Sequence, residues 1–142
     1  MTPVEALQAA LAGEHAALHV YGVLGGRVSV SAAPATAAAI SSAYAMHRAR
    51  RDQLRTMVQQ LGGDPVAADV SYELAGPSDT TPQIVREARG IEERCAEVYA
   101  QAVGATVRAQ RQWAIDALVD AAVRSLTFDG EPATFPGLPE LS

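Results

Sequence analysis

The chain has no lysine, a single cysteine and few aromatic residues, and each scarcity excludes some functions, folding environments or folds. All 11 basic residues are arginines, and 16 acidic residues outnumber them, so the net charge of -5 argues against a general nucleic-acid binder. The one cysteine, Cys95, cannot close an intramolecular disulfide, so folding does not depend on an oxidising compartment. Aromatic residues make up only 5% of the chain, so alanine and aliphatic side chains must build the core, which favours closely packed helices.

Long apolar runs are missing as well. No stretch is long and apolar enough to span a bilayer, which predicts no membrane contact. The N-terminus lacks the basic region and apolar run of a secretory signal. We therefore expect one cytoplasmic domain that covers residues 1–142.

Four segments show the 3.6-residue apolar period of amphipathic helices, whereas none shows the alternation of a strand. Thr2, Pro3 and Glu5 are typical of a capping box at the start of the first helix. Gly25–Gly26 is expected to end that helix, and the Gly62–Pro65 segment is expected to end the second. The predicted helices cover about residues 3–25, 34–61, 82–103 and 107–126.

The connections between these helices indicate the fold. The segment between the second and third helices, residues 62–80, is long, whereas the other two connections are short. Two hairpins joined by one long crossover is the ferritin-like arrangement of a four-helix bundle. We therefore predict an all-α, ferritin-like four-helix bundle with a long crossover and a Pro-rich C-terminal tail, which Phe135 and Leu138 could pin to the bundle.

The apolar face of each helix gives the predicted core. The third helix should begin at Thr81 as its cap, and Gly104 should interrupt its pattern. The inward positions of the second helix are predicted to be Ile40, Tyr44, His47, Arg51, Leu54, Val58 and Leu61. Those of the third are Ile84, Ala88, Ile91, Cys95, Val98 and Ala102. Those of the fourth are Ile115, Leu118, Val119, Ala122 and Leu126.

Polar residues on these inward faces are the candidate site. Glu14 lies on the apolar stripe of the first helix, and His47 and Arg51 lie on that of the second, with Tyr44 beside them. Charged side chains are rarely buried unless they pair with one another or bind a metal. The simplest interpretation is a buried Glu14–Arg51 pair with a hydrogen-bonded His47, which fixes the register of the bundle.

Several of these motifs together resemble a known family. They are Glu14–Ala17, Tyr21–Gly22, His47–Asp52 and Phe135–Pro139, and the similarity extends over nearly the whole chain. The pattern resembles an actinobacterial ferritin-like domain family of unknown function. The resemblance implies a bundle in which an inward glutamate of the first helix, here Glu14, would be a metal ligand.

The resemblance does not extend to the usual metal motif. A di-iron bundle takes a glutamate from two helices and Glu-x-x-His from the other two. Here Tyr44 stands three residues before His47, or, in the other register, His47 and Arg50 take the Glu and His positions. We therefore expect no intact di-iron site and no cofactor. The alternative is a residual iron or manganese site made by Glu14, His47 and Glu97.

Four further features have a functional and a structural interpretation. His15 and His19, one turn apart, could share a metal or lie at a surface or subunit contact. Cys95 could be a nucleophile but fits a core position, and Trp113 could cover the tail or a subunit interface. The arginines of the second helix could bind an anion or nucleic acid, or could pair with the acidic third helix: Arg48, Arg50, Arg51 and Arg55 against Glu87, Glu92, Glu93 and Glu97.

These observations lead to two principal hypotheses. The first is a non-enzymatic binding or structural module, expected to be a homodimer, whose small ligand or protein partner the sequence does not identify. The second is a residual metalloprotein that uses Glu14 and His47 for oxidoreductase chemistry or iron handling. Nucleic-acid binding through the arginines is the weakest of the possibilities, because no lysine and few aromatic residues accompany them.

Overall fold

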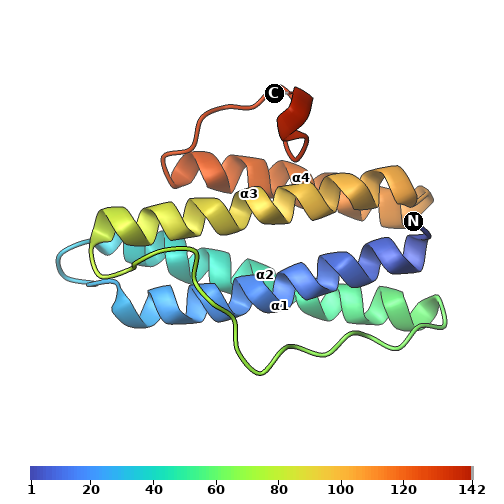
Figure 1. Cartoon of the computed structure of the whole chain (residues 1–142), viewed down its shortest axis with the longest axis horizontal. Helices are drawn as coiled ribbons and strands as arrows, with labels where there is room; N and C mark the ends of the chain where they lie inside the picture. Colours follow the sequence, from blue (N-terminus) through green and yellow to red (C-terminus); the bar gives the residue numbers. More distant parts are fainter. Residues whose placement is uncertain (142) are drawn as a thin grey trace.

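Four helices make up the bundle, in agreement with the all-α prediction. The structure is a computed structural model and describes residues 1–141. The helices are α1 (Pro3–Arg27), α2 (Pro34–Gln60), α3 (Thr81–Ala105) and α4 (Arg108–Thr127), and a 3₁₀ turn, η1 (Pro139–Leu141), lies near the C-terminus (Figure 1). No strand occurs within residues 1–141. The four-helix, all-α fold is therefore confirmed.

The helix ends follow local capping, with three corrections to the prediction. Thr2 and Glu5 form the expected capping box of α1, but the box of α3 uses Thr80 in place of Thr81. Gly25–Gly26 does not end α1, which continues to Arg27, and Gly104 lies inside α3. Glycine permits a helix end without requiring one. The helices stop where the next residue, Val28 or Thr106, takes an extended conformation.

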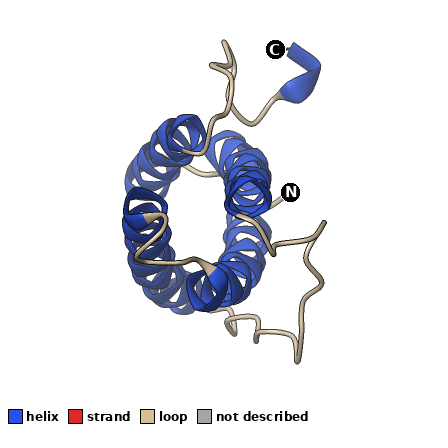
Figure 2. Ribbon diagram, turned by 90° about the vertical axis from the view of Figure 1, so that its left-hand side faces the viewer, coloured by secondary structure: helices blue, strands red, loops and turns tan. Residues whose placement is uncertain are grey.

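The long crossover passes along α1 and sets the order of the helices in space. It runs from the end of α2 back to the start of α3, so α2 and α3 point the same way (Figure 1). Gln8 donates to the carbonyl of Asp64 and accepts from the amide of Val66, which fastens the crossover to α1. Seen along the bundle, the helices form a closed ring (Figure 2). α1 packs against both α2 and α3, while α4 packs mainly against α3.

Most of the core is made of small and aliphatic side chains, with Tyr21, Tyr99 and Phe128 as its largest buried members. For α4 the predicted inward face is wrong by one position: Ile115, Val119 and Leu126 are 37%, 57% and 43% exposed. The buried residues of α4 are small and lie at the same helical spacing, namely Ala114, Ala117, Ala121 and Ser125. Their small size lets α4 approach α3 closely, so the apolar periodicity of the larger residues marks the outer face of the helix.

No helix in the described part of the chain is long and apolar enough to cross a membrane.

The C-terminal tail folds back over α3 and α4. Phe128, directly after α4, is buried in the core, and the tail then passes over the groove between the two helices (Figure 1). Gly137 touches the backbone of α3 and has a φ of 78°, so a Cβ there would clash with the carbonyl of Ala96. Phe135 and Leu138, which the sequence suggests could pin the tail, are 49% and 37% exposed.

Candidate functional site

A histidine between two glutamates lies at the centre of the bundle. Glu14 of α1, His47 of α2 and Glu92 of α3 are all fully buried. His47 Nδ1 lies 2.6 Å from Glu14 Oε2, and His47 Nε2 lies 3.0 Å from Glu92 Oε1. An ionised carboxylate only accepts hydrogen bonds, so between two of them the imidazole donates from both nitrogens, which is its protonated form.

The two carboxylates control the charge of His47. Burial alone would lower the pKa of the imidazole, but its hydrogen bonds to Glu14 and Glu92 and the negative charges of these two residues outweigh the effect of burial. Together they raise the pKa of His47 from 6.5 to about 9. At neutral pH the centre of the bundle is therefore an imidazolium held between two carboxylates.

Two tyrosines also donate hydrogen bonds to these carboxylates. Tyr21 OH donates to Glu92 Oε1 at 2.6 Å, and Tyr99 OH donates to Glu14 Oε1. Burial and the nearby negative charge raise the pKa of both phenols, so both remain neutral donors. The ring of Tyr21 also stacks on His47, with centroids 5.3 Å apart and planes at 24°.

A second ion-pair network adjoins the first. Arg50, one turn after His47, is only 5% exposed, and its Nη2 donates to Asp120 Oδ2 at 2.6 Å. Arg124 Nε donates to the same oxygen at 2.8 Å, and the Arg50 guanidinium lies 5.5 Å from the ring centre of Tyr99. Although partial burial works against ionisation, the two arginines lower the pKa of Asp120. Three carboxylates and three cations thus alternate through the interior.

Two buried atoms of this network are left without a partner. Within residues 1–141, neither Arg50 Nη1 nor Glu92 Oε2 makes a hydrogen bond. The two atoms have opposite character, since guanidinium nitrogens only donate and carboxylate oxygens only accept. Unsatisfied buried polar atoms are uncommon in folded proteins.

Glu14 and His47, which the sequence places on inward faces, lie together in the structure. Arg51 and Tyr44 do not join them, and this corrects the predicted cluster. The side chain of Arg51 is 28% exposed and binds the neighbouring Asp52 at 2.9 Å, while Tyr44 is 40% exposed. The predicted Glu14–Arg51 pair is wrong because the buried face of α2 passes one residue earlier, through Ala43 and Arg50.

Glu97, the third residue of the alternative metal set, is exposed and lies away from the cluster. Its place is taken by Glu92, for which the sequence suggested pairing with the arginines of the second helix as one of two alternatives. A signal for Glu92 was present: it follows Ala88 by four residues and precedes Tyr99 by seven, so all three share one helix face. The predicted inward Val98 is only half-buried, and Tyr99 is the buried residue at that turn.

Arginine pairing between α2 and α3 is also corrected. Arg50 pairs with Asp120 of α4, and Arg51 pairs with Asp52 of its own helix. Among the described residues, no ion pair joins an arginine of α2 to an acidic residue of α3, and Glu92 binds His47 of α2 instead. Glu87, one of those residues, accepts instead from the amide of Ala75 at 3.2 Å.

The other candidates from the sequence have structural contacts. His15 Nε2 lies 3.0 Å from the carbonyl oxygen of Val66, and the rings of His19 and Tyr72 lie 5.5 Å apart, so the two histidines hold the crossover. Trp113 donates to Gln53 Oε1 at 2.7 Å. Cys95 is buried in the core, and burial raises its thiol pKa well above the usual value, which opposes its use as a nucleophile.

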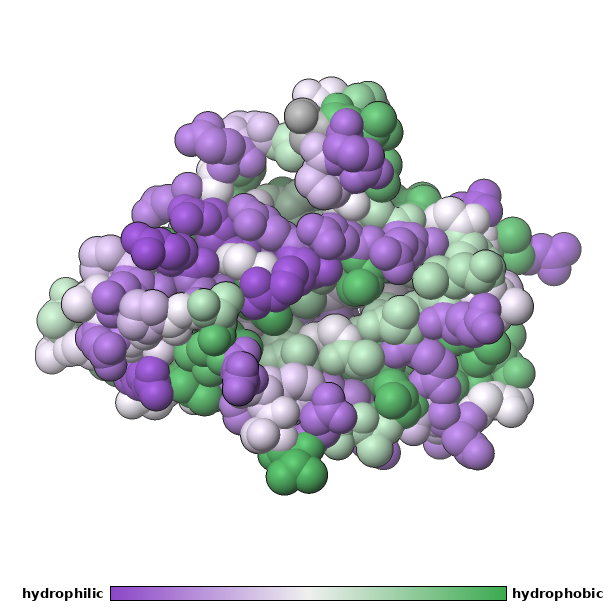
Figure 3. All heavy atoms as spheres, viewed as in Figure 1, coloured by the Kyte–Doolittle hydropathy of each residue, from purple (hydrophilic) through white to green (hydrophobic). Residues whose placement is uncertain are grey.

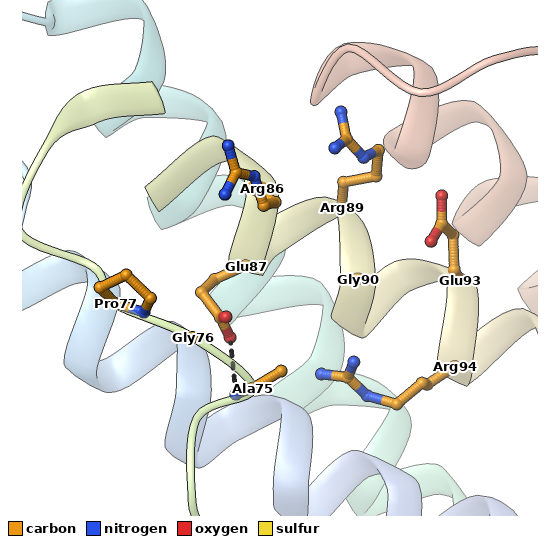
Figure 4. Close-up of a pocket in the computed structure, with 9 residues that line it drawn as sticks. All are labelled: Ala75, Gly76, Pro77, Arg86, Glu87, Arg89, Gly90, Glu93 and Arg94. Atoms are coloured by element: carbon orange, nitrogen blue, oxygen red, sulfur yellow. Dashed lines mark hydrogen bonds between the residues drawn. The ribbon is translucent and has the colours of Figure 1, made fainter. Parts of the chain in front are cut away.

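A shallow surface pocket on α3 is lined by Arg86, Arg89 and Arg94 (Figure 4). The three guanidinium groups point in different directions: Arg94 extends toward Ala75, while the other two lie on the opposite side of the helix. Arg89 donates to the carbonyl oxygen of Asp129 at 3.1 Å and so caps the end of α4. These arginines do not converge on a common point, so they do not form an anion site.

Comparison with known proteins identifies a protein of similar structure and a matching family. A conserved hypothetical protein, rv2844, from Mycobacterium tuberculosis has a crystal structure similar to this one, with a TM-score of 0.82 and 26% sequence identity. The match covers 89% of this chain and 87% of that one. No curated protein is significantly similar in sequence. The family described as a domain of unknown function (DUF4439) matches residues 6–140, nearly the full length, and the chain belongs to that family.

Proposed function

We propose that this protein is a non-enzymatic binding module on a ferritin-like bundle, and that the charges in its interior are balanced by its own side chains in place of metal ions. The observation that carries the proposal is His47, whose two ring nitrogens lie 2.6 Å and 3.0 Å from carboxyl oxygens of Glu14 and Glu92. An imidazolium with both nitrogens occupied has no lone pair for a metal. The carboxylates of Glu14 and Glu92, which would otherwise bind a metal cation, already hold the His47 imidazolium between them.

The donor set supports the same conclusion. A di-metal centre in such a bundle draws six ligands from four helices, including two histidines. Among the described residues, no group of three or more His, Cys, Asp or Glu side chains is arranged to hold a metal ion. α4 supplies Asp120, whose Oδ2 accepts from both Arg50 and Arg124. A dication next to Arg50 would also meet a fixed positive charge, so the residues present do not fit a di-metal centre.

Charge balance gives the proposal a physical basis. Burying one unpaired ion is costly, and buried ions are tolerated where opposite charges and hydrogen bonds compensate them. Glu14, Glu92 and Asp120 are matched by His47, Arg50 and Arg124. Adding two metal ions to this balanced set would leave a large excess of positive charge.

Metal analysis of protein purified without a histidine tag tests the proposal. We expect iron and manganese well below one equivalent per chain, no iron oxidation, and a thermal midpoint that a chelator leaves unchanged. The proposal would be contradicted by one equivalent of either metal per chain, provided that Glu14→Ala and His47→Ala lose the metal and the exposed control Glu97→Ala retains it.

Residual metal binding is a second candidate, favoured by one observation. Glu92 adds a second buried carboxylate to Glu14 and His47, and its Oε2 is unpartnered. A metal could bind there only if the imidazolium lost a proton, so affinity would rise with pH as His47 titrates at about 9. A Mn²⁺ titration below and above this pKa separates the candidates, since the binding module takes up no metal at either pH.

The homodimer and the cytoplasmic location expected from the sequence remain part of the proposal. The exposed apolar residues of α4 support a contact between two copies, because they form a stripe on one helix face: Ile115, Val119, Val123 and Leu126. Light scattering after size-exclusion chromatography should give the mass of a dimer for the unaltered chain and of a monomer for Val119→Glu. The mass of a monomer for both would contradict the dimer.

A further inference from the structure

The outer face of α4 carries a continuous apolar stripe. Ile115, Val119, Val123 and Leu126 are all exposed and follow one another at helical spacing, so they lie along one side of the helix. Single apolar residues are common on protein surfaces, whereas a contiguous apolar patch marks an interaction site. The charges around the stripe indicate which partner fits it.

Opposite charges stand at the two ends of the stripe. Before its first residue, Arg108 and Arg111 are exposed at the start of α4, where the first turn contains no acidic residue. After its last residue, Glu131 is exposed and lines the same groove as Leu126. Glu131 lies at the base of the tail, which stands over the helices as a separate ridge (Figures 1 and 3). Arg124, in the last turn, is bound to Asp120 and donates to α2, so it does not offset this acidic end.

A second copy of the chain complements this pattern when the two α4 helices run antiparallel. A two-fold axis presents the same patch from both copies, so the patch must be complementary to itself. Antiparallel pairing places Ile115 beside the partner's Leu126. Arg111 stands four residues before Ile115 and Glu131 stands five residues after Leu126, so Arg111 then lies at the level of the partner's Glu131. Parallel pairing would instead bring like charges together at both ends of the stripe.

We propose that two copies of the chain associate through antiparallel α4 helices, with their apolar stripes in contact and an ion pair between Arg111 and the partner's Glu131 at each end. The helix dipoles favour the same orientation, because each positive N-terminus lies beside a negative C-terminus. One helix face gives a small interface, so we expect a weak dimer. The inference rests on the homodimer of the proposed function and adds the orientation of the two copies and the charges that select it.

The distance between two identical labels tests the orientation. A spin label on Ala109→Cys, an exposed position near the start of α4, is measured by double electron–electron resonance in the full-length chain, while Cys95 is buried and should stay unlabelled. Position 109 lies about 11 residues from the middle of the stripe, so antiparallel helices should separate the two labels by roughly 35 Å. Parallel helices would hold them within roughly 20 Å.

Charge reversal tests the ion pairs. Glu131→Arg and Arg111→Glu each place like charges together at both ends and should weaken dimerisation at least about tenfold in sedimentation equilibrium. The double variant restores opposite charges, so it should dimerise more tightly than either single variant. Glu73→Arg and Arg55→Glu make the same charge changes at exposed positions on the crossover and on α2, and should leave dimerisation unchanged.

Two kinds of failure are distinguishable. Labels within roughly 20 Å of each other, or a double variant no tighter than the single variants, would overturn the inference and leave the homodimer in place. A monomer at every concentration would overturn both the inference and the homodimer, and would mean that α4 faces a different partner. In either case the metal content still tests the remainder of the proposed function.

Discussion

The protonation of His47 makes a quantitative prediction about stability. The ring is fully buried between two carboxylates, and its pKa is raised from 6.5 to about 9. A group with a raised pKa binds its proton more tightly in the folded state, so the stabilisation is fully present below pH 6.5 and is lost as pH rises through about 9. The difference between the two pKa values corresponds to about 3 kcal/mol of unfolding free energy.

Urea unfolding followed by circular dichroism, repeated from about pH 6 to about pH 10, measures this loss. Burial also raises the pKa values of Cys95, Tyr21 and Tyr99, so part of any decline at high pH belongs to these groups. His47→Gln serves as the control, because glutamine can donate a hydrogen bond but does not titrate. We expect the variant to be less stable near neutral pH and to lose about 3 kcal/mol less than the unaltered chain over this range.

The result that would refute this reasoning is a parallel decline in both proteins. It would mean that His47 gains no protonation energy from Glu14 and Glu92, so that the ring is neutral in the folded state at neutral pH. The argument for a cation at the centre of the bundle, and with it the metal-independent interior, would then fail.

Three further substitutions test neighbouring parts of the structure. Tyr99→Phe removes the buried donor to Glu14 and should cost about 2 kcal/mol in urea unfolding; a cost near zero would mean that this hydrogen bond adds nothing. Asp120→Asn removes the negative charge that pairs with Arg50 and should lower the unfolding free energy by about 1 kcal/mol. The effect is modest because the Asp120 side chain is 33% exposed. Unchanged stability would rule out a contribution from the Arg50–Asp120 pair. Gly137→Ala should loosen the tail without unfolding the helices, so amide hydrogen exchange should speed up in residues 131–139 alone. Protection of these amides equal to that in the unaltered chain would show that the tail does not need the close approach of Gly137 to α3.

The arrangement of the helices could be predicted because several independent signals agree. Capping residues, glycine- and proline-rich connections and the 3.6-residue period each indicate four helices, and the long segment at residues 62–80 indicates which pair runs parallel. The inward face of α4 could not be predicted, because Ile115 and Val119 carry a stronger apolar signal than the alanines that are buried. When a helix packs through alanines, close approach and not side-chain size decides which face is inside.

Half of the central cluster could be predicted and half could not. Glu14 and His47 stand out because each interrupts an apolar stripe. Arg50 was missed in favour of Arg51, because adjacent positions on a helix differ by about 100° and either fits an approximate stripe. Glu92 lies in a run of acidic residues, where composition alone gives no reason to choose one as buried; only its spacing to Ala88 and Tyr99 does so.

The central network also explains how an alanine-rich bundle holds one arrangement. α2 packs chiefly against α1 and meets α3 and α4 at few points, so apolar contacts alone fix its position poorly. The polar contacts are the ones that span these gaps: His47 joins α2 to both α1 and α3, and Arg50 joins α2 to α4 through Asp120. Each bond is directional and buried, so sliding α2 along its neighbours would leave a buried charge unpaired. We infer that the polar residues of this network, which in the proposed function balance the interior charge without metal ions, also set the register of the four helices.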